Sequence, residues 1–287
     1  MSEEQTKHLK KPDWLKIRLP GGENFSGIRE IIESRGLHTI CSSGNCPNLG
    51  ECWNAGTATF LILGDICTRS CGFCATQTGR PSPPDPEEPA RVAESIKLMK
   101  LRHCVITSVD RDDLSDAGAT HWAKTIREVK RINPGITIEV LVPDFEGSLT
   151  DLDLIIAEKP DIVSHNLETV RRLTPRVRSA AKYDRSLRVL RHTASSGSIA
   201  KSGIMVGLGE TEAEVLETMD DLLKAGAKIM TIGQYLRPTL NHLPVLEYIH
   251  PDQFEKYRQA GLSKGFRHIE SKPLVRSSYH AEKHIEK

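Results

Sequence analysis

The 287-residue sequence lacks long apolar runs, has few aromatic residues (5%) and carries almost no net charge. No stretch approaches the roughly 18 consecutive apolar residues of a membrane span, which excludes a transmembrane protein. The 39 basic and 38 acidic residues leave a formal charge of +1, so the composition favours neither nucleic acid nor an acidic membrane surface as a partner. With 38% hydrophobic and 27% charged residues, the chain has the composition of a soluble globular protein.

The sequence also lacks the marks of a targeting peptide. Its first fourteen residues, MSEEQTKHLKKPDW, contain neither an apolar core nor an Arg-rich stretch free of acidic residues. We therefore expect a cytoplasmic protein, in which thiols stay reduced. The seven cysteines are an odd number, which argues against a closed set of disulfides and favours metal-ligating or redox-active thiols.

From about residue 57 onward, short apolar runs alternate with longer amphipathic stretches, a rhythm typical of repeated βα units. Six strands are expected at residues 57–64, 103–109, 136–142, 160–167, 203–207 and 227–232. Five helices are expected at residues 89–100, 119–132, 151–158, 184–193 and 212–225. The strands are apolar almost throughout, which favours a parallel sheet covered on its outer face.

A closed barrel of eight βα units usually takes about 250 residues, whereas only six units fit here. We therefore predict an α/β fold, a partial (β/α)6 TIM-like barrel over residues 57–265. Residues 1–56 and the irregular polar residues 266–287 are expected to be flanking extensions. Segment 78–89 contains five prolines and is expected to be a stiff loop over one end of the barrel.

The sharpest motif is Cys67-x3-Cys71-x2-Cys74, directly after the first expected strand, where barrels keep their active sites. Thiolates are soft ligands that suit iron–sulfur clusters or zinc. Three of them would leave one iron of a four-iron cluster open to another ligand. A zinc knuckle is the alternative, although zinc sites usually show C-x2-C pairs and a fourth Cys or His nearby, and none follows here.

A second triad, Cys41-x4-Cys46-x5-Cys52, also differs from zinc-finger spacing and indicates a second cluster. The alternative is three free buried cysteines, but the glycine, proline and asparagine between them make a poor core segment. The seventh cysteine, Cys104, lies within an apolar run and is expected to be a core residue.

The first triad, with the aromatic Phe73 before its last cysteine, resembles the motif of radical S-adenosylmethionine (SAM) enzymes. The two triads together resemble the lipoyl synthase family, and the resemblance extends over nearly the whole chain. It also rests on Glu51-Cys52-Trp53, on residues 79–81, 108–114, 165–169, 201–210 and 235–238, and on the terminal Arg276-Ser277-Ser278-Tyr279. A biotin-synthase-like enzyme would share the Cys67 loop but neither the first triad nor this terminal motif. A non-catalytic zinc scaffold is the rival from another class.

The resemblance implies two [4Fe-4S] clusters. At the one on Cys67, Cys71 and Cys74, SAM would yield a 5'-deoxyadenosyl radical that abstracts hydrogen from a protein-bound octanoyl chain. The cluster on Cys41, Cys46 and Cys52 would donate sulfur to C6 and then to C8, with Ser277 as its oxygen ligand. From the residues alone Ser277 is a surface tail residue, and only the resemblance gives it this role.

The resemblance also implies partners and SAM contacts. The partners are an octanoylated lipoyl carrier (the lipoyl domain of a 2-oxoacid dehydrogenase, or the glycine cleavage H protein) and an electron donor such as ferredoxin or flavodoxin. The residues implied to bind SAM are Phe73, Thr107, Ser108, Asn166, Glu168, Arg178 and Gly207.

Each of these SAM contacts has an alternative in the sequence. Asn166 and Glu168 could equally cap a helix, and Thr107 and Ser108 could merely begin a turn. The glycines of segment 203–210 also suit ordinary tight turns. Four other arginines compete with Arg178 as the partner of the SAM carboxylate: Arg171, Arg172, Arg176 and Arg185. The alternative is that these arginines form a solvated basic helix face.

Overall fold

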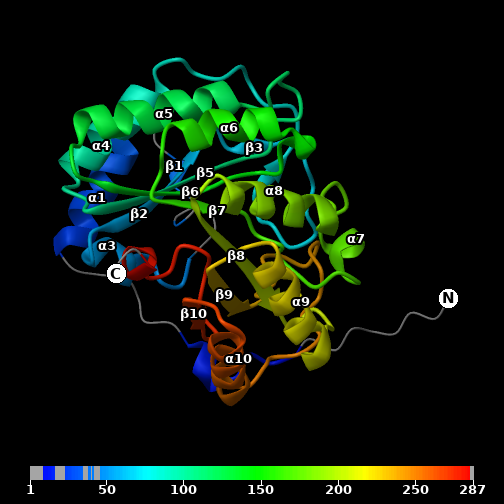
Figure 1. Cartoon of the computed structure of the whole chain (residues 1–287). Helices are drawn as coiled ribbons and strands as arrows, with labels where there is room; N and C mark the ends of the chain where they lie inside the picture. Colours follow the sequence, from blue (N-terminus) through cyan, green and yellow to red (C-terminus); the bar gives the residue numbers. More distant parts are fainter. Residues whose placement is uncertain (1–8, 17–22, 35–37, 40, 42–45, 285–287) are drawn as a thin grey trace.

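The computed structural model describes residues 9–16, 23–34, 38–39, 41 and 46–284 (Figure 1). Residues 1–8, on which the expected cytoplasmic location partly rests, lie outside this part. The main sheet has eight strands in the order β1-β2-β5-β6-β7-β8-β9-β10. Their bounds are β1 His38–Thr39, β2 Thr57–Ile62, β5 His103–Ser108, β6 Thr137–Leu141, β7 Ile162–Ser164, β8 Ile199–Val206, β9 Ile229–Gln234 and β10 His268–Ser271. The strands from β2 to β10 are parallel, and β1 runs antiparallel to β2.

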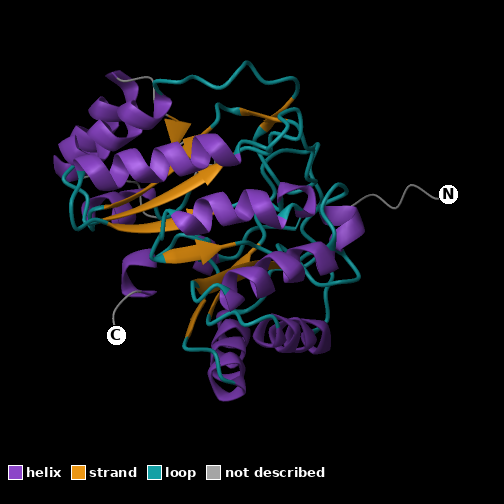
Figure 2. Ribbon diagram, turned by 45° about the horizontal axis from the view of Figure 1, so that its top comes forward, coloured by secondary structure: helices purple, strands orange, loops and turns teal. Residues whose placement is uncertain are grey.

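The helices follow the strands in βα order and lie along the outer face of the curved sheet (Figure 2). Those of the barrel are α4 Glu88–Leu98, α5 Ala119–Ile132, α6 Leu149–Ala157, α7 Thr174–Val177, α8 Tyr183–Ser195, α9 Glu212–Lys224 and α10 Pro251–Lys264. The N-terminal extension adds α1 Glu23–Ser34 and α3 Leu49–Asn54, and the 3-10 turns are η1 Asp13–Leu15, η2 Phe145–Gly147 and η3 Ala281–His284. None of the helices in these described ranges is long and apolar enough to cross a membrane.

Burial explains why the apolar runs become strands. Every residue of β2 and of β9 is buried, as expected for parallel strands with both faces covered. One part of the core packs β2, β5 and β6 against α4, α5 and α6, with Trp122 fully buried. A second part packs β8, β9 and β10 against α8, α9 and α10.

The predicted α/β fold with a parallel sheet is confirmed, and all six expected strands and five expected helices are present. The prediction that the residues after 265 are irregular is wrong, because β10 pairs there in parallel with β9. The described sheet therefore has seven parallel strands, and its edge strands β1 and β10 do not pair with each other. Strand β10 contains a single apolar residue, Ile269, so it gave no apolar run to detect.

The C-terminal segment packs against the N-terminal extension (Figure 1). Asn48 Nδ2 donates a hydrogen bond to the carbonyl of Leu274 (2.7 Å). Thr59 Oγ1, within β2, donates to Ser278 Oγ (2.9 Å), and the Tyr279 hydroxyl donates to the Glu51 carboxylate (3.1 Å). Residues 48–51, which precede β2, and residues 274–279 therefore meet beside this strand.

A fully buried ion pair lies inside the sheet. Lys201 of β8 donates from Nζ to both carboxylate oxygens of Glu139 in β6, at 2.8 Å each. The same Nζ donates to His284 Nδ1 (3.2 Å), which seats the C-terminal 3-10 turn against the sheet. A buried pair of this kind is costly to break, because removing one partner leaves the other charge unpaired.

We therefore expect Lys201→Met to lower the free energy of unfolding by about 3–5 kcal/mol, measured by urea denaturation. Adding Glu139→Gln should recover part of this loss, since no unpaired charge then remains. The control is Lys256→Met on the exposed face of α10, which should change stability by no more than about 0.5 kcal/mol. Equal losses for Lys201→Met and Lys256→Met would contradict this account.

Candidate active site

The Cys67–Cys74 loop is anchored at both ends and in its middle. Strand β3 (Ile66–Cys67) pairs with β4 (Gln77–Thr78), which closes the loop at its base. The Gly72 amide donates to the carbonyl of Val177 (2.9 Å), and the Gly72 carbonyl accepts from the Leu243 amide (3.0 Å). The three thiols therefore lie on a backbone held by the last residue of α7 and by the loop that contains Leu243.

Of the three thiols of this loop, Cys67 is buried and Cys71 and Cys74 are partly buried. Burial raises the pKa of Cys67, and it raises the pKa of Cys71 to about 12, with the nearby Arg178 opposing the shift. Cys67 Sγ accepts hydrogen bonds from the backbone amides of Arg69 (3.4 Å) and Asp110 (3.3 Å). Because thiolates are the metal ligands, occupation of the loop by a metal would release protons.

The loop suits a cluster better than a single ion. Within the ranges that the structure describes, no three His, Cys, Asp or Glu side chains converge closely enough to hold one metal ion. A four-iron cluster binds each cysteine through a different iron, so its ligands stand apart. Cys67, Cys71 and Cys74 supply three ligands of this kind on one short loop.

Residues predicted to bind SAM lie at the carboxyl ends of three strands of the parallel sheet, β5, β7 and β8. Thr107 and Ser108 end β5, Asn166 and Glu168 follow β7, and Gly207 follows β8. Thr107 Oγ1 donates to the Leu141 carbonyl (3.0 Å), and Ser108 Oγ accepts from Trp122 Nε1 (3.2 Å). Both hydroxyls therefore also hold the barrel together.

Asn166 has an unused acceptor. Its Nδ2 donates to Glu168 Oε1 and to Ser277 Oγ, both at 3.1 Å. Its Oδ1 is buried and has no hydrogen-bond partner in the described part of the chain. A donor group on a bound ligand would satisfy this oxygen, which supports the prediction for Asn166.

Arg178 is distinguished from the other arginines by its surroundings. It donates from Nη1 to the carbonyls of Asn166 (2.8 Å) and Leu167 (3.3 Å), and its charge acts on Cys71. Arg171 and Arg172 instead make exposed ion pairs on the outer face. Phe73, which lies within the cysteine loop, packs against the second part of the core.

Gly207 occupies a position that only glycine suits. Its φ of +101° is in the left-handed region, and a Cβ would collide with Gln234 Nε2 and lie 2.5 Å from the Glu247 carbonyl oxygen. The amides of Gly207 and Leu208 donate to the Glu210 carboxylate at 2.5 and 3.0 Å. The turn is therefore fixed tightly at the end of β8.

The N-terminal triad forms the wall of a separate cavity. Cys41 is buried and Cys46 and Cys52 are partly buried, and burial raises the pKa of all three, that of Cys41 to about 11. The cavity is lined by these three thiols and by Asn48, Leu49, Thr57, Thr59, Arg276, Ser278 and Tyr279. Sequence patterns missed Thr57 and Thr59, because nothing in an apolar strand marks its polar residues as cavity-lining.

The two adjacent serines belong to different surroundings. Ser278 lines the cavity of the N-terminal triad and accepts from Thr59 Oγ1. Ser277, the residue implied by the family resemblance, accepts from Asn166 at the end of β7 instead. Cys104 is fully buried in β5, as expected of a core residue.

Comparisons with known proteins show the family of the chain. Residues 61–222 match the model of the radical SAM superfamily. The chain is 64% identical to a lipoyl synthase of Parabacteroides distasonis, covering 97% of this chain and 99% of that protein. It is 66% identical to one of Phocaeicola vulgatus (97% and 98% covered) and 59% identical to one of Treponema denticola (98% and 97% covered). The chain belongs to the lipoyl synthase family.

Lipoyl synthases are radical SAM proteins, and membership of that superfamily implies a four-iron cluster and SAM. Two solved structures share the fold. Methylornithine synthase has a TM-score of 0.56 at 13% identity, covering 88% of this chain and 79% of that protein. The FeFe-hydrogenase maturase HydG from Carboxydothermus hydrogenoformans has a TM-score of 0.56 at 14% identity, covering 91% and 69%. The family resemblance drawn from the cysteine triads is thereby confirmed.

Gly207→Ala should destabilise the protein by about 1–3 kcal/mol more than Gly197→Ala, because its Cβ has no room. Gly197 has a similar φ of +84° but open space around it, so its substitution isolates the backbone strain alone. Thermal and urea unfolding of both variants check this difference. Equal losses would show that the contacts with Gln234 and Glu247 relax freely.

Proposed function

We propose that this chain inserts two sulfur atoms, at C6 and C8, into a protein-bound octanoyl group to form the lipoyl group. The observation that carries the proposal is the pair of cysteine triads, one before and one after the buried strand β2 in the sequence. The terminal segment 276–279 contacts the surroundings of both, through Ser277 at Asn166 and Ser278 at Thr59. One triad generates the radical and the other supplies sulfur.

When bound, the clusters and SAM supply the 5'-deoxyadenosyl radical and the sulfide. Cys67, Cys71 and Cys74 hold the radical cluster, and Cys41, Cys46 and Cys52 hold the second. Asn166 offers its buried Oδ1 to a donor of SAM, with Glu168 beside it and Arg178 fixing the strand end. Thr107, Ser108, Phe73 and Gly207 form the remaining walls, and the backbone of Gly207 is fixed there because Gln234 and Glu247 fill the space where a Cβ would lie.

The organisation of the chain follows from these roles. Residues 1–56 contribute the cysteines of the second cluster, residues 57–265 most of the barrel, and residues 266–287 the last strand and the serine segment. The substrate is an octanoylated lipoyl carrier, either a lipoyl domain of a 2-oxoacid dehydrogenase or the glycine cleavage H protein. A ferredoxin or flavodoxin in the cytoplasm supplies electrons.

Two triple variants test whether one triad holds the radical cluster and the other holds the cluster that donates sulfur. After anaerobic reconstitution the wild type should hold about eight irons, two four-iron clusters. Changing Cys67, Cys71 and Cys74 to alanine should leave about four irons and abolish cleavage of SAM. Changing Cys41, Cys46 and Cys52 to alanine should also leave about four, with 5'-deoxyadenosine still formed but no sulfur inserted. Cleavage of SAM by the first variant, or lipoyl formation by the second, would refute the proposal.

A serine oxygen as fourth ligand of the second cluster would leave an iron more readily than a thiolate. We retain Ser277, the residue implied by family resemblance, as this ligand; binding would require its hydroxyl to leave Asn166. Ser277→Ala should then abolish sulfur insertion but not 5'-deoxyadenosine formation, and Ser277→Cys should keep normal iron content with little product.

Ser278→Ala is the matched control for this prediction, one residue away. If Ser277 is the ligand, Ser278→Ala should retain sulfur insertion. Loss of insertion in Ser278→Ala, with normal product from both Ser277 variants, would assign the ligand to Ser278, which lines the cavity.

A further inference from the structure

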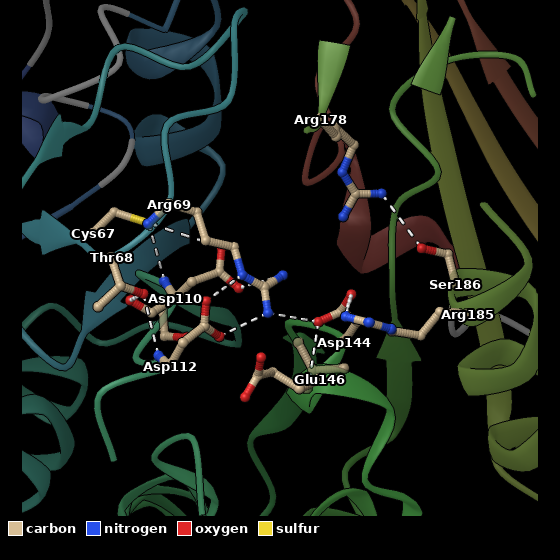
Figure 3. A network of polar contacts seen from close by, with 12 residues as sticks. Cys67, Thr68, Arg69, Asp110, Asp112, Asp144, Glu146, Arg178, Arg185 and Ser186 are labelled. Carbon is tan, nitrogen blue, oxygen red and sulfur yellow. Dashed lines mark hydrogen bonds and ion pairs between the residues drawn. The ribbon is translucent and has the colours of Figure 1, made fainter. Parts of the chain in front are cut away.

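Arg69 lies in the middle of the Cys67–Cys74 loop, yet its side chain is only 5% exposed and faces three carboxylates (Figure 3). Its Nε and Nη2 donate to the two oxygens of Asp112 at 2.6 and 2.7 Å. Nη2 also lies 2.8 Å from Asp144 Oδ1, and Nη1 lies 3.3 Å from Asp110 Oδ1. A bidentate guanidinium–carboxylate pair fixes orientation as well as charge, so Arg69 is held in one geometry.

The three carboxylates come from two different βα loops. Asp110 and Asp112 follow β5, and Asp144 follows β6. Asp144 also pairs with Arg185 of α8 (3.2 Å) and accepts from the amide of Glu146 (3.1 Å). Arg69 thereby ties the cysteine loop to two successive strand ends of the barrel.

Thr68 makes a second connection to the same loop. Its amide and its hydroxyl both donate to the carbonyl of Asp110, at 3.1 and 3.0 Å. Its hydroxyl oxygen accepts from the amide of Asp112 (3.1 Å). Residues 68–69 and 110–112 are therefore joined side by side through backbone and side chains.

This junction includes both backbone amides that donate hydrogen bonds to Cys67 Sγ. The two amides that donate to Cys67 Sγ belong to Arg69 and Asp110, the residues that the junction holds together. Hydrogen bonds to a ligating sulfur are among the features that set the potential of an iron–sulfur cluster, and outer residues of this kind orient metal ligands. Fewer such bonds leave more charge on the sulfur and make the cluster harder to reduce.

We propose that Arg69 is a positioning residue for the radical cluster, which holds both amide donors on Cys67 and thereby keeps the cluster reducible. The inference rests on the proposed function, since it takes Cys67, Cys71 and Cys74 as cluster ligands. It adds that the loop between the cysteines sets the potential of one cluster independently of the other.

The test uses the full-length reconstituted protein and redox titration followed by electron paramagnetic resonance. The radical cluster is the one whose signal changes on addition of SAM, and the other cluster serves as an internal reference. Arg69→Lys keeps the positive charge but loses the planar fork. Thr68→Val keeps the shape of the side chain and replaces its hydroxyl by a methyl group, which removes the hydrogen bonds of Thr68 Oγ1 to Asp110 and Asp112.

Both variants should shift the potential of the SAM-responsive cluster to more negative values and leave the other cluster unchanged. Arg172→Lys, which alters an exposed ion pair with Glu214, should shift neither. If Arg69→Lys fails to fold, Thr68→Val still tests whether the junction of residues 68–69 with residues 110–112 sets the potential, and an unmoved potential in that variant would overturn the proposal. Normal clusters with unmoved potentials would overturn the role of Arg69 and leave the proposed function intact. A wild type without any SAM-responsive signal would overturn the proposed function and, with it, this inference.

Discussion

The contact of residues 48–59 with residues 274–279 is the constraint on which the site depends. Thr59 and Ser278 are 219 residues apart in sequence, and Asn48 and Leu274 are 226 apart, yet each pair is joined by a hydrogen bond. The cavity of the N-terminal triad takes its walls from both ends as well as from β2. Neither terminal segment can form this cavity alone, so it exists only in the fully folded barrel.

Strand β2 relates the two triads in space. The cavity of the N-terminal triad is lined by Thr57 and Thr59 of this strand, and Cys67 follows shortly after its last residue, Ile62. The parallel sheet then places the ends of β5, β7 and β8 at the same edge as the Cys67 loop. The terminal segment bridges these regions, because its successive serines contact Asn166 on one side and Thr59 on the other.

Much of the fold follows from the sequence because parallel strands buried on both faces are apolar almost throughout. Strand β10 escaped detection for the opposite reason, since Ile269 is its only apolar residue. The cysteine triads could be recognised because three thiols at short fixed spacing are typical of the ligands of a metal or cluster. Arg69 and Asp144 could not, since their pairing depends on two loops that meet only in the folded chain.

The serines show a further limit of sequence reasoning. A motif names a pair of adjacent residues, but neighbouring side chains in an irregular segment face different surroundings. The spacing of Ser277 and Ser278 cannot tell which hydroxyl meets the thiols, whereas the structure separates them by their partners, Asn166 and Thr59.

The central claim is that the protein's own second cluster is the source of both inserted sulfur atoms. The most direct measurement is a single-turnover reaction of protein reconstituted with ³⁴S-sulfide, with the mass of the lipoyl product determined in buffer containing unlabelled sulfide. The account predicts a product carrying two heavy sulfur atoms, in an amount no greater than one per chain. A product with unlabelled sulfur would contradict it, because the sulfur would then come from solution and not from the cluster held beside β2.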